Sequence, residues 1–237
     1  MIKFENLQIV GWEPTIRGMR NPMNSWDKSD SGVGCDKEGT ICRLCEHNND
    51  RWPGDCYDHF RIGPNDRKLM MQLAKGGSDH AKYRRMIIVY VDIIAPLYWW
   101  KEFDTYKVGT VANSCSTMHK IHAKEFTLDD FSHEHLIVNN PVPCKLFSPL
   151  QALGVQIDIL NKYREMYLES GDKEYWWQMI QLLPSSYNQR RTIEFNYEVL
   201  SNMYSSRKNH KLDEWRELCK WIEGLPCSEI ITGVEKR

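Results

Sequence analysis

A chain of 237 residues is long enough for one domain with a sizeable core, or for one domain that carries a small insertion. Hydrophobic residues make up 41% and charged residues 27%, which excludes a disordered chain, and the formal net charge of −1 argues against a nucleic-acid-coating surface. The sequence contains no apolar run of membrane-spanning length and starts without a signal-peptide pattern. We therefore expect a soluble, cytoplasmic protein.

The amino-terminal stretch predicts a strand, a short helix and then a polar insertion. Residues 2–10 alternate weakly between apolar and polar positions, as a half-buried strand does. Residues 15–26 predict a helical turn or two, which Pro22 breaks. From residue 28 to residue 62 the apolar period is lost and Gly, Asp, Asn, Cys and Pro dominate. We expect 28–62 to be an inserted loop or a metal-held subdomain.

Regular structure is expected to resume after this insertion. Asn65 or Asp66 is placed to cap a helix that Gly76-Gly77 ends. Residues 86–94 form a β-branched run that predicts the clearest strand of the chain, stopped by Ala95-Pro96. A short aromatic helix, LYWWKEF, follows it.

The carboxy-terminal half predicts mostly helices. Ser148 and Pro149 have the residue types of a helix cap and first turn, and Gly171 sits where the carboxy-terminal cap of that helix belongs. Further helices are expected at 172–182, 196–206 and 211–224, and a strand at 186–195. This order predicts an α+β fold, with residues 1–237 forming a single domain around the insertion.

Four cysteines fall in the polar insertion, and they suggest a metal site. Cys42-Arg-Leu-Cys45 has the spacing that lets two thiolates reach one tetrahedral ion. The segment has too few apolar residues to fold by burial, so a structural zinc would supply the folding energy. An iron–sulfur cluster, or no metal, remains an alternative, and His47 or His59 are substitute ligands. The predicted zinc ligands are Cys35, Cys42, Cys45 and Cys56.

The segment from Asn65 to His80, followed by the run MIIVYVDIIAP, resembles the flavin-dependent thymidylate synthases. In that family a helix leads through Gly-His-x-Ser-Pro-Phe-Glu-His into a strand that ends in Ala-Pro. Counted back from Ala95-Pro96, His80 falls without a gap on the family's first histidine, which implies that His80 contacts a flavin. The family's Ser-Pro-Phe-Glu-His is replaced here by residues 82–86.

The following stretch, TYKVGTVANSCSTM, is similar to the family's long signature when one extra residue is allowed. The matching positions are Lys107 to an arginine, Thr110 to a serine, Asn113 to the asparagine and Ser116 to the second serine. The substituted positions are Thr105-Tyr106 for Arg-His, Ser114 for the glutamate and Met118 for the last arginine. Several positive charges that hold flavin and nucleotide phosphates in the family are therefore missing.

The carboxy-terminal third resembles the family without a gap, through the pattern Leu-Pro, Asn, Asn, Leu-Arg and His. Leu183-Pro184 begins this match. The resemblance implies that Arg207 binds the nucleotide and that Asn196, Asn202 and His210 contact the flavin or the nucleotide. The stretches TYKVGTVANS and RKNHKLDEW are also similar to phage- or prophage-encoded relatives, which implies a bacterial or phage-infected cell.

The resemblance implies an antiparallel sheet with packed helices, and a homotetramer whose sites form between subunits. It implies FAD as cofactor, a pyrimidine nucleotide such as dUMP as substrate, and folate as the one-carbon donor. Ser116 and Arg207 would act on the reacting base, with Ser114 as a further substrate contact. We expect His80, the 107–116 loop and the 202–210 helix end to converge on one pocket.

The chemistry of the residues allows this assignment but does not require it. Lys107, Arg207 and His210 can pair with phosphates, and the Asn and Ser side chains can bond the edge of a base or flavin. An exposed helical asparagine or a helix-end arginine is equally common without any ligand. Two functions therefore remain open: a flavin enzyme acting on a pyrimidine nucleotide, or a non-catalytic nucleotide-binding or interaction module with a zinc loop.

Overall fold

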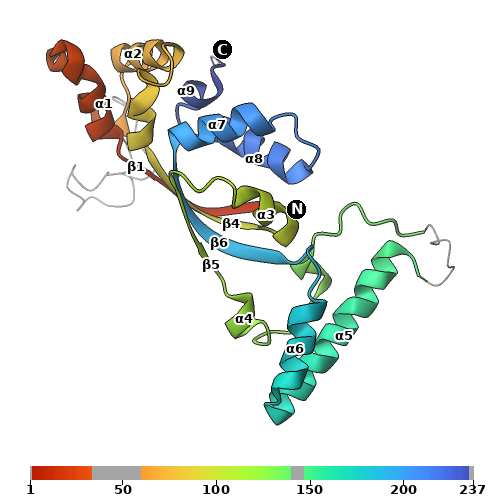
Figure 1. The fold of residues 1–237 in the computed structure, drawn as a ribbon. Helices are drawn as coiled ribbons and strands as arrows, with labels where there is room; N and C mark the ends of the chain where they lie inside the picture. Colours follow the sequence, from red (N-terminus) through yellow and green to blue (C-terminus); the bar gives the residue numbers. More distant parts are fainter. Residues whose placement is uncertain (1, 34–59, 140–146, 235–237) are drawn as a thin grey trace, which may run out of the picture. The chain divides into compact units, whose positions relative to one another are not determined.

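The computed structural model describes residues 2–33, 60–139 and 147–234 (Figure 1). The predicted zinc ligands lie outside these residues. The chain divides into two compact units, each assembled from separate stretches. The first unit comprises Met1–Gln8, Tyr90–Glu194 and Lys208–Leu218, and the second comprises Ile9–Val89, Phe195–Arg207 and Cys219–Arg237.

A four-stranded sheet, most of whose residues belong to the first unit, has the strand order β1-β4-β6-β5. Two backbone hydrogen bonds fix β4 and β6 as antiparallel: Leu97 donates to Tyr187 at one end, and Tyr197 donates to Ile87 at the other. The strands are β1 (Lys3–Val10), β4 (Ile88–Pro96), β5 (Thr110–Ser114) and β6 (Asn188–Asn196). The predicted strands at 2–10, 86–94 and 186–195 are confirmed, although β4 continues through Ala95-Pro96 instead of stopping there.

β5 corrects the expectation that residues 107–116 form a loop. Its five residues show no apolar alternation, and all but Thr110 are exposed, so periodicity gives no signal. Pairing with β6 determines the strand instead: the N–H of Cys115 donates to the carbonyl of Arg190 at 2.9 Å, and Gln189 Nε2 donates to the Cys115 carbonyl at 2.8 Å. Because β5 is the last strand in the order and pairs only with β6 in this sheet, Thr110, Asn113 and Ser114 lie along an edge of the sheet.

An aromatic cluster packs α3 (Leu97–Phe103) in the first unit. The rings of Trp99, Trp100 and Phe103 are fully or almost fully buried and meet Trp215 from the start of α8 (Asp213–Gly224). The Arg191 guanidinium lies over the Trp100 ring at 4.3 Å. These tryptophans are core residues, as their large apolar area favours.

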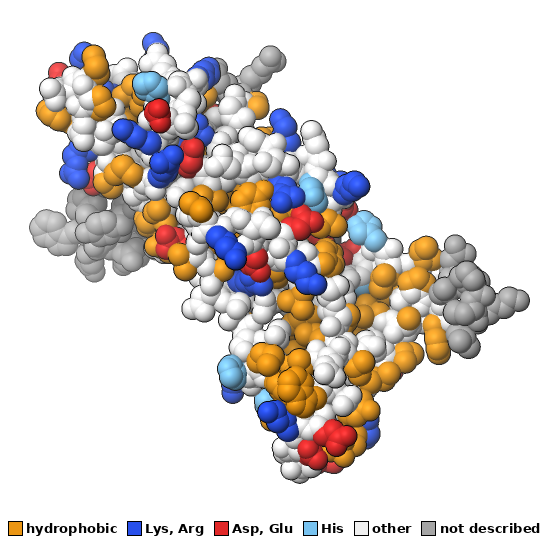
Figure 2. All heavy atoms as spheres, in the orientation of Figure 1, with side chains coloured by type: hydrophobic (Ala, Val, Ile, Leu, Met, Phe, Trp, Pro, Cys, Tyr) orange, Lys and Arg blue, Asp and Glu red, His pale blue; other side chains and the backbone are white. Residues whose placement is uncertain are grey.

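Two helices, α5 (Pro149–Ser170) and α6 (Lys173–Leu182), lie side by side in the first unit. Ser148 caps α5 through a reciprocal pair of bonds with Gln151, and Gly171 ends it in the left-handed conformation at φ 69°, as predicted. Figure 2 shows hydrophobic side chains on the surface of this pair. The exposed large apolar side chains of α5 and α6 are Val155, Ile159, Leu168, Trp177 and Leu182. The short α4 (Thr117–Lys120) and η5 (Leu128–Asp130) precede them.

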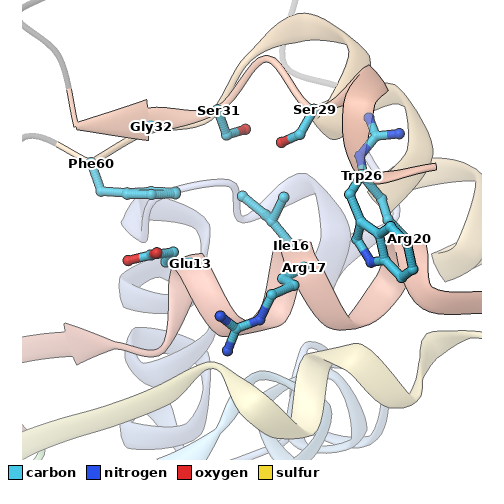
Figure 3. Close-up of a pocket in the computed structure, with 9 residues that line it drawn as sticks. All are labelled: Glu13, Ile16, Arg17, Arg20, Trp26, Ser29, Ser31, Gly32 and Phe60. Atoms are coloured by element: carbon cyan, nitrogen blue, oxygen red, sulfur yellow. The ribbon is translucent and has the colours of Figure 1, made fainter. Parts of the chain in front are cut away.

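The second unit is mainly helical. Its elements are α1 (Trp12–Arg20), η1 (Asn21–Met23), η2 (Trp26–Lys28), β2 (Gly32–Val33), β3 (Phe60–Arg61), α2 (Pro64–Lys75), η4 (Ala81–Met86), α7 (Tyr197–Arg207) and α9 (Glu229–Thr232). Residues of α1, Trp26 of η2, residues 29 and 31–32 and Phe60 of β3 line a cavity of about 310 Å³ (Figure 3). We call this cavity the α1 cavity.

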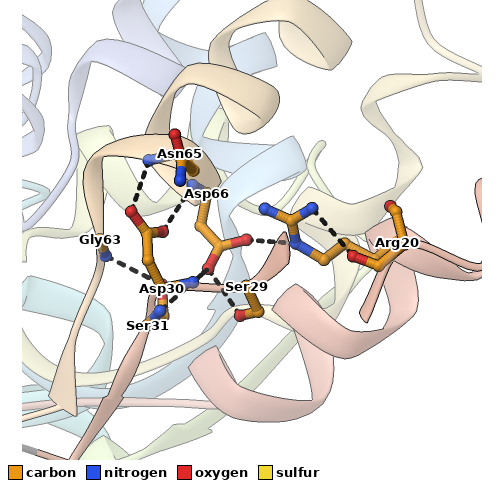
Figure 4. Close-up of polar contacts among 8 residues, drawn as sticks. Arg20, Ser29, Asp30, Ser31, Gly63, Asn65 and Asp66 are labelled. Atoms are coloured by element: carbon orange, nitrogen blue, oxygen red, sulfur yellow. Dashed lines mark hydrogen bonds and ion pairs between the residues drawn. The ribbon is translucent and has the colours of Figure 1, made fainter. Parts of the chain in front are cut away.

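A hydrogen-bonded cluster, which we call the Asp30–Asp66 clasp, joins the chain on both sides of residues 34–59 (Figure 4). Asp66 is fully buried and accepts from Arg20 Nε at 2.6 Å and from Ser29 Oγ at 2.7 Å. The Asp30 carboxylate accepts from the backbone N–H of Asn65 at 2.8 Å and of Asp66 at 3.1 Å. A side chain from a distant part of the sequence therefore accepts hydrogen bonds from the N–H groups in the first turn of α2, which have no partner within the helix.

This arrangement corrects the predicted cap of α2. Neither Asn65 nor Asp66 caps the helix, because it starts at Pro64 and the capping carboxylate comes from Asp30. Gly63 precedes the helix, and a Cβ there would lie 2.2 Å from the Asp30 carboxyl carbon. Only glycine permits this approach.

The first helix also begins earlier than expected. α1 starts at Trp12 and ends at Arg20, whereas we expected helical turns within 15–26. Pro14 lies in the first turn, where the missing N–H costs nothing, and Gly11 makes the turn from β1 at φ 95°. Pro22 falls in η1, so the predicted break at Pro22 is confirmed.

Among the residues that the structure describes, no helix is both long and apolar enough to cross a membrane.

Candidate functional site

The predicted site residues are divided between the two units. The second unit contains His80, Asn196, Asn202 and Arg207. The first unit contains Lys107, Thr110, Asn113, Ser114, Ser116 and His210. Each group is described within its own unit.

In the second unit, His80 lies directly before η4, and its side chain is exposed. The imidazole packs over Gly76, where a Cβ would come within 3.2 Å of its ring atoms. The glycine therefore leaves the space that His80 occupies after the helix α2 ends. The ring remains accessible to a ligand.

Buried Arg84 ties the segment after His80 to α7. Its Nη1 donates to Ser201 Oγ at 2.7 Å and its Nη2 donates to the Ala74 carbonyl at 3.1 Å. Glu198 lies 3.7 Å away and adds an ion pair. Arg84 therefore connects η4 to α7 through a buried cation.

Three predicted site residues of the second unit, Asn196, Asn202 and Arg207, lie before, on and at the end of α7. Asn196 Oδ1 accepts from the N–H of Val199 at 3.0 Å and so caps the first turn of α7, and its amide N–H groups donate to none of the residues that the structure describes. Asn202 is exposed on α7. Arg207 is the last residue of α7, half-buried, where a cation also complements the helix dipole.

In the first unit, β5 presents a row of polar side chains. Thr110 is half-buried and its hydroxyl donates to the Tyr106 carbonyl. Asn113 and Ser114 are exposed on the strand, and Lys107 is exposed in the turn before it. The row offers one cation together with amide and hydroxyl groups that can donate and accept.

Ser116 caps the short helix α4. Its Oγ accepts from the N–H of His119 at 3.1 Å, which leaves the hydroxyl proton free to donate. In the described part of the chain, Ser116 has no side-chain hydrogen bond to a base that would activate it as a nucleophile. Its chemistry is that of a hydrogen-bond donor.

His210 is held by contacts on both ring nitrogens. Nδ1 accepts from the N–H of Leu212 at 3.2 Å, and Nε2 lies 3.4 Å from Glu102 Oε2. Glu102 also accepts from Trp215 Nε1 at 2.9 Å. In this conformation His210 anchors the segment before α8, and it would have to exchange the Glu102 contact to bind a phosphate.

Asp92, the only charge of the β4 run, is a structural group of the sheet. It accepts from Thr192 Oγ1 at 2.6 Å, from Asn6 Nδ2 at 2.9 Å and from Arg190 Nη1 at 3.2 Å. The hydrogen bond from Thr192 and then that from Asn6 lower the pKa of Asp92 below its ordinary value. The cation that pairs with Asp92 is Arg190.

Comparisons with known proteins address the fold directly. A scan against protein-family models gives no match, and a search of curated protein sequences also gives none. The fold is nevertheless that of the flavin-dependent thymidylate synthases, as the sequence resemblance implies. Thymidylate synthase X from Helicobacter pylori, solved with FAD and dUMP, matches with a TM-score of 0.61 at 15% identity, over 97% of this chain and 96% of that chain.

A second enzyme has a similar fold. The UMP/dUMP methylase PolB from Streptomyces cacaoi, bound with 5-Br UMP, matches with a TM-score of 0.58 at 12% identity. The match covers 98% of this chain and 95% of that chain. The α+β architecture expected from the sequence is thus confirmed over almost the whole chain.

Proposed function

We propose that this protein is a flavin-dependent enzyme of pyrimidine nucleotide metabolism that transfers a one-carbon unit to C5 of dUMP or a related nucleotide. The observation that supports this most is the fold match over 97% of the chain to an enzyme solved with FAD and dUMP. A match of that extent includes the regions of β5 and α7, where the sequence motif independently places polar and cationic residues.

The donor set of the chain suits FAD and a nucleotide. Lys107 and Arg207 supply cations for phosphates, and Asn196, whose Oδ1 caps α7, offers its amide N–H groups to a ring edge. Bound FAD in its reduced form would supply the hydride, and folate the carbon. The chain's own residues bind and orient these rings, with His80 beside the flavin and Ser114 at the nucleotide.

Ser116 and Arg207 are proposed to act on the reacting base. The Ser116 hydroxyl has a proton to donate, and the Arg207 guanidinium stabilises negative charge that develops on the ring. No cysteine attack on the base is invoked, because the hydride and the carbon unit come from bound groups. In this proposal the site forms between subunits of a homotetramer.

The purified protein tests this proposal through its colour and its ligand. We expect a yellow protein with the visible absorbance of oxidised flavin, and saturable binding of dUMP. Arg207→Ala should weaken dUMP binding by about 1–3 kcal/mol, the cost of a lost charged hydrogen bond. Lys208→Ala, which removes the adjacent exposed cation, serves as control. Equal binding by both variants would contradict the assigned role of Arg207.

A non-catalytic nucleotide-binding or interaction module is the second candidate. It is supported by the substitutions Ser114 and Met118 at positions where the family has a glutamate and an arginine, and by the Glu102 contact that occupies His210. A colourless protein that binds dUMP but no added FAD would favour this candidate over the enzyme.

A further inference from the structure

His210 and Glu102 meet within the first unit, where a ligand can reach both side chains. Imidazole Nε2 of His210 lies 3.4 Å from Glu102 Oε2, and the two side chains are 23% and 37% exposed. Any ligand group that binds His210 at Nε2 therefore lies beside a carboxylate.

The backbone determines which ring nitrogen of His210 carries the hydrogen. The N–H of Leu212 donates to Nδ1 at 3.2 Å, so Nδ1 acts as an acceptor. In a neutral imidazole the hydrogen is then on the other nitrogen. Arg216 Nη1 donates to the His210 carbonyl at 3.0 Å, which holds the backbone of this residue as well. The N–H donor that the neutral ring offers to a ligand is therefore Nε2–H, beside Glu102.

Glu102 is held in place by contacts other than that with His210. Its Oε2 accepts from Nε1 of the fully buried Trp215 at 2.9 Å. Its backbone carbonyl accepts from the Thr105 hydroxyl at 2.7 Å and from the Thr105 N–H at 3.2 Å. The carboxylate therefore stays beside Nε2 when a ligand binds there.

This arrangement of one donor and one acceptor suits a hydroxyl group and disfavours a phosphate. A hydroxyl can accept from His210 Nε2–H while it donates its own hydrogen to Glu102. Because Nε2 and Oε2 are 3.4 Å apart, one ligand oxygen can lie about 2.8 Å from both. A phosphate dianion only accepts hydrogen bonds, and its charge would lie close to the carboxylate, where like charges repel each other.

We propose that His210 and Glu102 together bind a sugar hydroxyl of the ligand, and that Glu102 keeps phosphate away from His210. This role rests on the proposed function, which makes His210 a contact of the nucleotide or the flavin. The sugar of a nucleotide and the ribityl chain of a flavin both offer such a hydroxyl. Glu102 is thus a specificity-determining residue of the ligand site.

Titration calorimetry with matched ligands distinguishes a hydroxyl contact from a phosphate contact. The ligands are UMP and dUMP, each with its nucleoside, 2′,3′-dideoxyuridine monophosphate, riboflavin, and lumiflavin, which has no ribityl chain. If the hydroxyl belongs to the nucleotide, His210→Ala should weaken nucleotide and nucleoside by the same factor, about tenfold, and spare the dideoxy compound. If it belongs to the flavin, the loss should fall on riboflavin and spare lumiflavin. A larger loss for a nucleotide than for its nucleoside, or an equal loss for the ligands without the hydroxyl, would overturn the proposal.

Substitution of Glu102 tests its part in the same contact. Glu102→Gln keeps an oxygen for Trp215 Nε1, so the variant should fold, and its melting temperature checks this. It should weaken the same hydroxyl-bearing ligands, and the double variant with His210→Ala should bind no more weakly than His210→Ala alone, because both side chains hold one group. Losses that add in the double variant would contradict a shared hydroxyl. His135→Ala breaks the exposed pair of His135 and Asp213 in the same unit and should bind like the unaltered protein.

The exclusion of phosphate has a test that needs neither a nucleotide nor a flavin. Inorganic phosphate should shift the NMR signals of the His210 ring in Glu102→Gln and leave them unchanged in the unaltered protein. An equal shift in both proteins would refute the exclusion, even if the proposed function holds. Failure of the unaltered protein to bind any of the nucleotides or flavins would instead refute the proposed function, and the hydroxyl contact with it.

Discussion

At the scale of single residues, the buried pair of Arg20 and Asp66 stabilises the second unit. Neither side chain is more than 5% exposed, and each has further hydrogen bonds that satisfy it. Removal of one partner leaves a buried charge without compensation. We predict that Asp66→Asn lowers the free energy of unfolding by about 3–5 kcal/mol in urea titrations. If that variant fails to fold, Arg20→Lys keeps the positive charge but loses one of the two guanidinium hydrogen bonds, and should lower the free energy of unfolding by less.

Asp30→Asn is the matched control for this prediction. It also neutralises an aspartate of the clasp, but Asp30 is exposed and acts at the start of α2. A charge in that position contributes about 0.3–1 kcal/mol. A loss for Asp66→Asn no larger than that for Asp30→Asn would contradict the importance of burial.

The pH dependence of Asp66 follows from its surroundings. Burial raises the pKa of Asp66, but hydrogen bonds from Ser31, Ser29 and Arg20 outweigh it and hold the pKa below the ordinary 3.8. A lowered pKa in the folded state means that the contribution is complete above pH 3.8 and is lost as the pH falls through the folded value. The difference between the unaltered protein and Asp66→Asn should therefore shrink below that pH.

At the scale of elements, local sequence signals determine how much could be predicted. α5 was predictable because Ser148, Pro149 and Gly171 mark both of its ends in the sequence. β5 was not, because its pairing with β6 is decided by a strand that lies far along the chain. The predicted cap of α2 was wrong for the same reason, since Asp30, which accepts from the first-turn N–H groups, is remote from Pro64 in sequence.

In the candidate site too, the sequence predicts local features but not the contacts between residues that are far apart in the chain. The motif places Asn196 and Arg207 at the two ends of one helix, and the structure confirms that helix. The motif could not show that Glu102 contacts His210, or that Arg84 is buried and hydrogen-bonded to Ser201 of α7. The α1 cavity was missed because Glu13, Trp26 and Phe60 come from three segments without a shared pattern.

The zinc loop remains a prediction at this scale, because its cysteines lie outside the described residues. Metal analysis of the purified protein should find about one zinc per chain. Cys42→Ser with Cys45→Ser should release the metal, since the ion needs both thiolates. Cys115→Ser alters an exposed cysteine of the first unit and should retain it. A metal-free protein with four reactive thiols in the insertion would refute the zinc site.

At the scale of the whole molecule, exposed apolar residues on α5 predict self-association. Val155 and Ile159 are one turn apart on α5, and both are exposed apolar residues. We predict a tetramer in light scattering, and Ile159→Glu should shift it to smaller species by placing a charge in an apolar contact. Leu168→Glu lies on the opposite side of α5 by the helical period and should leave the mass unchanged. A monomer at all concentrations would rule out a site shared between subunits.

The Asp30–Asp66 clasp suggests that residues 34–59 can be removed without loss of the fold around them. In the antiparallel β2–β3 pair, Val33 faces Phe60, so the chain leaves and returns at one point. An Asn-Gly linker can join two such residues in a tight hairpin turn. A shortened protein that lacks residues 34–59 should fold and melt within a few degrees of the full one, as calorimetry would measure. Modularity of this kind would let the extra segment be gained, lost or exchanged without disturbing its host.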